Sequence, residues 1–424
     1  MPDTLTEVID IARLRVGHFV FVDLGGISHP FPLNGFRIQS TAQIEVLRAL
    51  GIERIRYSPD RSDPEPCFPR EPARAAIDDR DKPTAKAKQN RSARKETLDE
   101  RHARLQACER EFVGVARSYR RIVELARASP PKAHESTQRL VAEIAGPLIR
   151  SSETCIHLLS ERVGDHAPHE INVTVISLLL GKACGLDEAA LHELGVAALL
   201  HDLGKLDLPD RLRYEYDPRS AAEQQLFQNH VGHGVAIGTR MGLSNDVLKM
   251  IAQHHERADG SGYPARLTND RLPPGSRILT VANHYDNLCN PGNPALALTP
   301  HEALSQIFAH AKESFDATTV NVLVRMMGVY PAGSIVQLTD DRYALVLSVN
   351  ATRLLKPRII IHDPQIPRAA ALVVDLAEHP ALGIRRSLRP LQLPRAALDY
   401  LSPRTRICYF FEHARRDDDE DLAR

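Results

Sequence analysis

The sequence predicts a mainly α-helical protein that carries a small α/β unit at its N-terminus and a short β-rich extension at its C-terminus. The central region predicts helices because apolar residues recur there at helical spacing. This pattern occurs in residues 170–184, 187–200, 245–256, 274–288 and 301–311. Runs rich in β-branched and aromatic residues occur instead at 16–24 and across 334–363, and such runs are typical of strands.

The overall composition is that of an ordinary globular protein. Of the 424 residues, 43% are hydrophobic and 25% are charged. Lysine and arginine total 54, and so do aspartate and glutamate, so the formal net charge is zero. This neutrality disfavours a general role in binding duplex nucleic acid, which usually requires a large positive excess. It still allows a local basic pocket for a small anion.

The cysteines and the apolar runs indicate a cytoplasmic location. None of the six cysteines has CxxC spacing, which argues against a zinc ribbon or a disulfide scaffold and fits a reducing compartment. The first residues include acids and lack a long apolar core, so we expect no signal peptide. No run approaches the ~18 apolar residues of a membrane span.

Residues 1–63 are expected to form the small α/β domain. Within it, 16–24 predicts a strand, 41–51 predicts a helix because its apolar residues have helical spacing, and 52–58 predicts a second strand. Residues 64–96 are rich in proline, alanine and charged residues and poor in large apolar side chains. Such a segment buries too little surface to offset its ordering entropy, so we expect a flexible linker.

The remaining chain divides into four expected parts. Residues 97–135 predict a helix that connects domains or mediates dimerisation, or else packs on its own domain. Residues 136–330 are expected to form the helical domain, nearly without strands. Residues 331–412 predict the β-rich extension, and 413–424 predict an acidic, solvated tail.

Histidines and carboxylates form a spaced series in the helical region, which includes two adjacent pairs. The series is Asp165, His169, His201-Asp202, His230 and His254-His255. Imidazole and carboxylate groups are ligands of divalent metals, and without a thiolate among them iron or manganese fits at least as well as zinc. An aspartate can bridge two ions, and two ions can activate water for attack on phosphorus. Lys205, one turn after His201, would then neutralise a phosphate oxygen.

Each feature taken alone has an ordinary structural explanation. A single histidine on an apolar helix face is usually a core residue, and we assign four histidines to that class. They are His166, His192, His233 and His284. Gly260, Gly262 and Pro264 would serve equally well in a simple turn. The joint occurrence of these features in one order is what favours a site.

The motifs resemble a known family. HDLGK (201–205) together with HHERADGSGYP (254–264) resembles the HD-GYP family, bacterial metal-dependent phosphodiesterases of cyclic di-GMP within the HD phosphohydrolase superfamily. The resemblance covers about residues 150–330 and implies an all-helical HD-type core. The N-terminal unit resembles the small domain often found ahead of HD-GYP domains, and the β-rich part after 329–333 resembles a C-terminal extension seen in many members.

The resemblance implies a role for each matching residue. It implies two or three divalent ions, with iron or manganese expected. The implied ligands are His169, His201, Asp202 as a bridge, His230, His254 and His255, with Asp165 available to a third ion. Lys205 and Asp202 would act in catalysis near the scissile phosphate. Gly262, Tyr263 and Pro264 would shape the substrate wall, with the Tyr263 ring against guanine.

Two departures from the family pattern bear on activity. Asn283 stands where the family usually has an aspartate that closes the metal site, so one negative charge is missing and the amide can coordinate only weakly. Residues 290–296 lack the basic stretch that meets the substrate phosphates in family members. Phosphate recognition then falls to Lys205 or Arg257, or is weak.

These observations leave three functions open. The first is hydrolysis of cyclic di-GMP to pGpG or GMP. The second is a regulatory module, impaired by Asn283, that binds a nucleotide or a signalling partner. The third keeps the enzyme and changes the substrate to another cyclic dinucleotide or nucleotide. A homodimer or a signalling protein partner would act through the N-terminal unit and the helix at 97–135.

Overall fold

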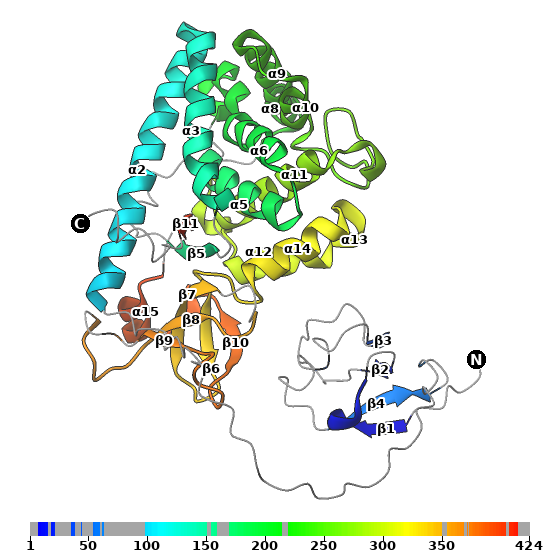
Figure 1. The fold of residues 1–424 in the computed structure, drawn as a ribbon, viewed down its shortest axis with the longest axis vertical. Helices are drawn as coiled ribbons and strands as arrows, with labels where there is room; N and C mark the ends of the chain where they lie inside the picture. Colours follow the sequence, from blue (N-terminus) through cyan, green and yellow to red (C-terminus); the bar gives the residue numbers. More distant parts are fainter. Residues whose placement is uncertain are drawn as a thin grey trace, which may run out of the picture. The chain divides into compact units, whose positions relative to one another are not determined.

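The computed structural model divides the chain into two compact units, Met1–Ser92 and Ala93–Arg424 (Figure 1). It describes residues 7–15, 18–21, 35–38, 44, 54–59, 62, 98–150, 154–158, 169–213, 219–349, 354–368, 371, 373–403 and 407–413. The expected linker, residues 64–96, and all but the first residue of the expected tail, 413–424, lie outside these ranges.

The N-terminal unit contains a four-stranded antiparallel sheet in the order β1-β4-β2-β3. The strands are β1 (Glu7–Asp10), β2 (Phe19–Phe21), β3 (Gly35–Arg37) and β4 (Arg54–Ser58). Val20 and Ile55, from neighbouring strands, are buried in a small apolar core. β2 and β4 lie within the two segments predicted as strands. Of the helix predicted at 41–51, only Ile44 is described, and it is helical.

The second unit begins with two long helices, α2 (Leu98–Ala128) and α3 (Pro130–Arg150), joined through Ser129 and packed together (Figure 1). Phe112 and Ile122 of α2 and Val141 of α3 are almost wholly buried, and they belong to the main core. The structure therefore favours the interpretation in which the helix predicted at 97–135 packs on its own domain.

The helical core surrounds α5 and α6, whose apolar side chains face neighbours on all sides. Residues 171–181 of α5 are all buried, which is why the sequence there is apolar almost without interruption. The core helices are α5 (His169–Ala183), α6 (Glu188–Leu200), α9 (His230–Met241), α10 (Asn245–Gln253), α11 (Pro274–Cys289), α12 (Pro300–Ala309) and α14 (Ala317–Met327). Shorter helices are α7 (Asp210–Arg213), α8 (Ala221–Gln228) and α13 (Ala311–Ser314). The mainly helical core predicted from the sequence is confirmed.

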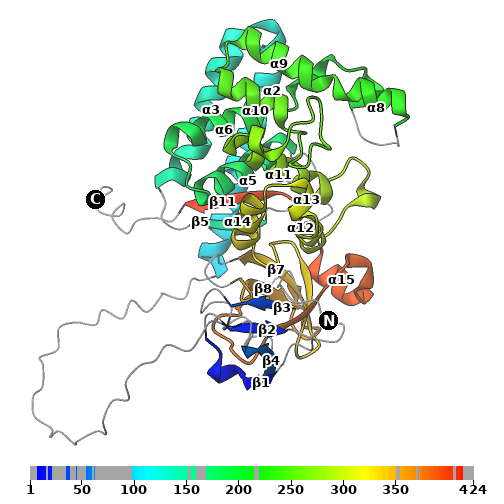
Figure 2. The same ribbon diagram turned by 90° about the vertical axis from the view of Figure 1, so that its right-hand side faces the viewer.

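One strand interrupts the region that we expected to be nearly all helix. β5 (Thr154–Leu158) pairs with β7 and with the last strand, β11, and Figure 2 shows β5 and β11 together beside α5. This strand is stabilised by partners far along the chain, so local periodicity did not reveal it. The helical region and the β-rich extension are consequently parts of one compact unit.

The C-terminal part forms the rest of this seven-stranded sheet. Its path runs β10-β6-β7-β5-β11, with β8 on β7 and β9 on β8. The strands are β6 (Ile335–Leu338), β7 (Tyr343–Val349), β8 (Arg358–Ile361), β9 (Val373–Asp375), β10 (Ile384–Leu388) and β11 (Tyr409–His413), with helix α15 (Arg395–Leu401) before the last. Among the described helices, none combines the length and apolar character that crossing a bilayer requires.

Candidate metal centre

Helix ends converge on one buried point and carry the predicted ligands to it. His201 caps the C-terminus of α6, His230 begins α9 and His254 caps the C-terminus of α10. Asp202 follows His201, and all four side chains are buried. His169 reaches the same point from the start of α5. The structure thus brings together groups that lie far apart in sequence.

Three imidazole rings are held in one tautomer by main-chain carbonyls of α6, α8 and α10. In each ring Nδ1 donates a hydrogen bond to the main-chain carbonyl three residues earlier. The distances are 2.7 Å from His201 to Ala198, 2.6 Å from His230 to Phe227 and 2.6 Å from His254 to Ile251. A carbonyl only accepts, so Nδ1 carries the proton and Nε2 keeps a lone pair for a ligand.

Asp202 lies between two groups of histidines and presents one carboxylate oxygen to each. Its Oδ1 lies 3.4 Å from Nε2 of His230 and 3.7 Å from Nε2 of His254. Its Oδ2 lies 3.4 Å from Nε2 of His201 and 3.9 Å from Nε2 of His169. The potential ligand atoms of each group lie within 4.8 Å of one another, with His255 joining the first group. These two groups of residues, which share Asp202, would hold divalent metal ions.

The buried polar atoms of this centre fit a divalent cation. Asp202 Oδ1 and His255 Nε2 are buried and have no hydrogen-bond partner, and such orphaned atoms are costly unless something binds them. Burial lowers the pKa of His230 to about 3 and holds that of His255 well below its usual value. Both rings are therefore neutral, which is the form that ligates metals.

Lys205 lies next to the bridging carboxylate. Its Nζ is 2.6 Å from Asp202 Oδ2. Burial would raise the pKa of Asp202, but the nearby Lys205 ammonium and His201 ring hold it well below its usual range. The same ammonium lies 5.4 Å from the centroid of the Phe227 ring, on which the Arg219 guanidinium also packs at 3.6 Å. The predicted phosphate-binding lysine is thus at the centre.

His169 is oriented by an aspartate that sequence reasoning did not assign to the site. Its Nδ1 lies 2.5 Å from Oδ2 of Asp286. Burial opposes protonation of this ring, but the bond to Asp286 outweighs it and raises the His169 pKa to about 9. Asp286 is held in turn by the side-chain amides of Asn172 and Asn290, at 3.0 and 2.9 Å from its Oδ1. Asp286 lies three residues after Asn283 and so on the same face of α11, and this spacing could have indicated its role from the sequence.

Asn283 lies beside His169, where the family resemblance led us to expect it. Its Oδ1 is 2.9 Å from His169 Nε2 and 2.9 Å from Nδ2 of Asn287. The amide therefore lies beside His169 without contributing a negative charge. Asp165, the expected ligand of a third ion, lies outside the described residues. The structure thus describes two ligand groups.

The loop after α10 folds directly against the histidine pair. The Tyr263 ring stacks on His255 at 4.6 Å between centroids, with 20° between their planes. A Cβ on Gly262 would meet the His255 carbonyl oxygen at 2.5 Å, so only glycine allows this approach. The loop borders a cavity of about 290 Å³ lined by Gln228, Gly260, Ser261, Gly262, Tyr263, Pro264 and Arg266. Three predicted substrate-wall residues line this cavity.

Other predicted residues take different places. Arg257 does not line the cavity but lies near His284, whose pKa is lowered to about 4 by burial and then by the charge of Arg257. The His284 ring packs on Phe315 at 5.1 Å, in keeping with the structural role assigned to it. Sequence reasoning missed Glu256, which is wholly buried, although its position inside the second motif was a signal.

Comparison with known proteins agrees with this geometry. Residues 130–319 match the family model of the HD domain, and residues 7–137 match a domain of unknown function, DUF3391. A cyclic di-GMP phosphodiesterase of Pseudomonas aeruginosa is 26% identical over 83% of this chain and 84% of the relative. A cyclic di-GMP phosphodiesterase response regulator of Xanthomonas campestris is 28% identical over 44% of this chain.

A third relative is named for a different substrate. A 3′3′-cGAMP-specific phosphodiesterase of Vibrio cholerae is 30% identical over 45% of this chain. The chain spans about half of the Xanthomonas protein and 35% of the Vibrio protein. Residues 130–319 of this chain therefore match the HD domain, and cyclic-dinucleotide phosphodiesterases are among the proteins that the chain resembles.

Proposed function

We propose that this protein is a metal-dependent phosphodiesterase that hydrolyses cyclic di-GMP to pGpG or GMP in bacterial second-messenger signalling. The observation that carries the proposal is the position of Asp202, with one oxygen facing His230 and His254 and the other facing His201 and His169. The names of the relatives from Pseudomonas and Xanthomonas support the choice of substrate. Iron or manganese is the metal that we propose, because the donors are nitrogen and oxygen atoms.

The residues of the centre account for the chemistry as follows. Divalent ions supply positive charge beside the scissile phosphorus and a water of lowered pKa. Asp202 fixes the spacing of the two ligand groups. Lys205, 2.6 Å from Asp202, is placed to neutralise a phosphate oxygen in the transition state. Tyr263, stacked on His255, borders the cavity that receives the nucleotide.

The test is hydrolysis of cyclic di-GMP by the full-length protein, loaded anaerobically with Fe(II) or Mn(II), with products separated by chromatography. We expect pGpG or GMP, and we expect Asp202→Ala to lose turnover and bound metal while its circular dichroism spectrum stays helical. His192→Gln is a matched control, since His192 contacts the Gln138 carbonyl away from the centre. No product from a metal-loaded protein would overturn the proposed reaction.

A regulatory module is the second candidate, and Asn283 is the observation that favours it. Its uncharged amide lies 2.9 Å from His169 Nε2, where a carboxylate would attract a cation. In that case the protein would bind cyclic di-GMP with micromolar or better affinity and release no product.

A preference for another cyclic dinucleotide, as the Vibrio relative's name indicates for that protein, would appear as faster turnover of 3′3′-cGAMP in the same assay.

The remaining parts of the proposal concern location and partners. We propose a cytoplasmic protein, which the free thiols of the described cysteines fit. Self-association or contact with a signalling protein would involve the N-terminal unit, which is a separate compact unit. Size-exclusion chromatography with light scattering on the whole chain tests self-association.

A further inference from the structure

The loop beside the metal centre holds an arginine in a backbone conformation that normally favours glycine. Arg266 has φ of 53°, and among the described residues only two other non-glycine residues have positive φ. An L-amino acid with a Cβ is disfavoured there. A residue kept in such a conformation is a reason to look for a function of its side chain.

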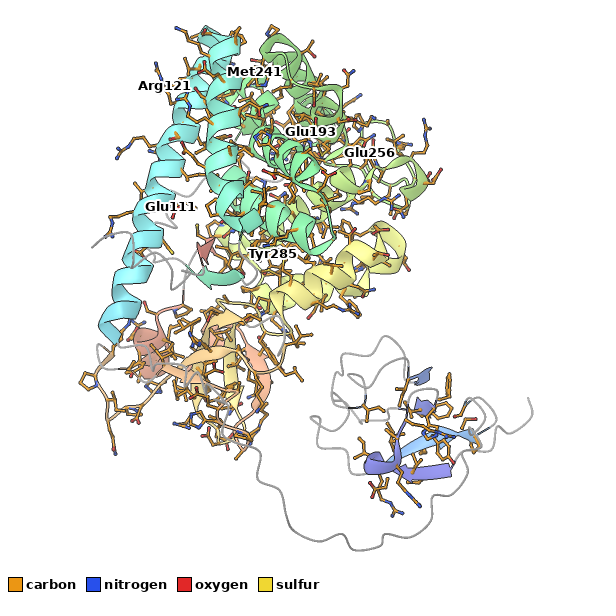
Figure 3. All side chains as sticks on the ribbon, viewed as in Figure 1. Glu111, Arg121, Glu193, Met241, Glu256 and Tyr285 are labelled. Atoms are coloured by element: carbon orange, nitrogen blue, oxygen red, sulfur yellow. The ribbon has the colours of Figure 1, made fainter. Side chains whose placement is uncertain are left out.

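A buried carboxylate fixes this conformation from both sides. Glu256 is wholly buried and lies on the loop that follows α10 (Figure 3). Its Oε1 accepts a hydrogen bond from the Ala265 amide at 2.6 Å, and its Oε2 accepts one from the Leu267 amide at 2.8 Å. These amides flank Arg266, so the turn cannot relax without breaking a charged hydrogen bond. Because Glu256 follows His255 directly, the turn is attached to the metal-ligand segment.

The arginine borders the cavity next to the metal centre. Arg266 is the only charged residue among those that line the cavity of about 290 Å³. Its side chain is exposed, and no hydrogen bond or ion pair ties it to the described part of the chain. Tyr263, on the same cavity wall, stacks on His255, so one ring separates the cavity from a metal ligand.

Other cations near the centre already have contacts that hold them elsewhere. Lys205 pairs with Asp202, and Arg219 packs on Phe227. Arg257 does not line the cavity, and residues 290–296 contain no basic side chain. Arg266 is therefore the cation best placed to meet a second anionic group of a ligand that already reaches the metal centre.

We propose that Arg266 binds the phosphate of the substrate that is not being cleaved, with Glu256 as the residue that positions it. This proposal rests on the proposed function, because a cyclic dinucleotide carries two phosphodiesters and only one of them reacts at a time. The guanidinium forms charge-assisted, bidentate bonds with phosphate oxygens. Arg266 then supplies the phosphate contact that the segment after α11 lacks.

The deciding variant is Arg266→Gly, because glycine accepts the positive φ and removes only the side chain. Arg271→Ala is the matched control, since Arg271 is exposed, close in sequence and outside the cavity lining. We expect Arg266→Gly to keep or raise the melting temperature. We expect its KM for cyclic di-GMP to rise about ten-fold or more, the scale of one charged hydrogen bond, with kcat within about two-fold. Arg266→Lys should recover part of the loss.

A small diester separates binding from the integrity of the centre. Bis(p-nitrophenyl) phosphate has one phosphate, so its kcat/KM should fall far less than that of cyclic di-GMP in Arg266→Gly. An unchanged KM for cyclic di-GMP, or an equal fall for both substrates, would overturn the role of Arg266. If the unaltered protein does not hydrolyse cyclic di-GMP, the proposed function fails. Calorimetric measurement of cyclic di-GMP binding then tests the role of Arg266 separately. Weaker binding by Arg266→Gly than by the unaltered protein supports the inference. Equal binding by the two proteins, or no binding by either, overturns it.

Discussion

Asp202 and the three helix-anchored imidazoles show how single residues prepare this centre before any ion arrives. Each Nδ1 bonds a main-chain carbonyl three residues earlier, so each Nε2 faces the carboxylate with little side-chain freedom left to lose. Preorganisation of this kind lowers the entropic cost of binding. The two residues that depart from this scheme, His169 and Asn283, are where substitution is most informative.

Asn283→Asp is expected to strengthen metal binding. The new carboxylate would lie beside His169 Nε2, where the amide oxygen is now 2.9 Å away, and it would restore a negative charge to the ligand group. We expect a gain in metal affinity of roughly ten-fold, with a parallel gain in turnover. Inductively coupled plasma mass spectrometry and the hydrolysis assay measure both. Asn293→Asp adds the same charge elsewhere, and an equal gain from that control, or no gain from Asn283→Asp, would contradict the impairment by Asn283.

Asp286→Asn is expected to weaken metal binding without unfolding the protein. The Asp286 carboxylate lies 2.5 Å from His169 Nδ1. This contact makes the other ring nitrogen more basic and so a stronger ligand for a metal ion. Replacing it should cost about 10- to 100-fold in metal affinity, the usual range for such an outer partner. Metal titration followed by thermal melting separates the two effects. A loss of melting temperature with full metal affinity would show that Asp286 serves packing alone.

At the scale of elements, the centre depends on how closely the 3₁₀ turn Leu203–Asp207 approaches α9. A Cβ on Gly204 would meet the His230 carbonyl oxygen at 1.9 Å and the Gly234 nitrogen at 2.4 Å. Both are backbone atoms, so neither can move without shifting the start of α9. The glycine of the first motif is therefore required by packing, and the position of His230 depends on it.

Gly204→Ala is expected to lower the free energy of unfolding by about 1–3 kcal/mol, as overpacking does, and to reduce metal content by displacing His230. Gly232→Ala is the matched control on α9, because a Cβ there has no neighbour within 4 Å. Alanine should stabilise that helix by up to ~1 kcal/mol. Urea denaturation of the three proteins measures this. Equal stability of the two variants would disprove the close approach.

At the scale of the whole molecule, the last strand is tied to the core beside the metal centre. The Ile407 carbonyl accepts from the side chains of Asn172 and Asn290, at 2.7 and 2.8 Å, and both of these also hold Asp286. The Tyr409 hydroxyl lies 3.0 Å from that of Tyr285, which is wholly buried on α11 (Figure 3). The C-terminal segment therefore supports His169 through Asp286.

Truncation tests this connection. A chain that ends at Pro403 should lose cooperative unfolding or melt many degrees lower, because the buried Tyr285 loses its bond to Tyr409 and the buried Asn172 loses its bonds to Ile407 and Tyr409. A chain that ends at His413 keeps β11 and should melt like the whole protein. Removing Met1–Ser92 should leave the second unit folded and able to bind metal, since that unit has its own core. Calorimetry and metal analysis read out all three, and an unaffected Pro403 truncation would contradict the dependence on β11.

Much of the fold and the ligand set could be predicted from sequence because both are local. Apolar spacing specifies α5, α6, α10, α11 and α12 within a few residues, since each helix buries one face or is buried all round. The histidine and aspartate ligands are conspicuous because their chemistry and their position at helix ends are visible in short motifs. The helical fold class and the match to an HD domain could be predicted from these features.

Tertiary structure decided what depends on partners distant in sequence. β5 exists because β7 and β11 offer backbone partners from the far end of the chain. Asp286 orients His169 across 117 residues, and Glu256 gives Arg266 its place by bonds that only the folded loop can form. Hydrogen bonds of this kind leave no periodic trace in the sequence, because they join single residues rather than repeated faces. The sequence by itself predicted the helices and the candidate metal ligands, and the tertiary structure determined how those side chains are oriented.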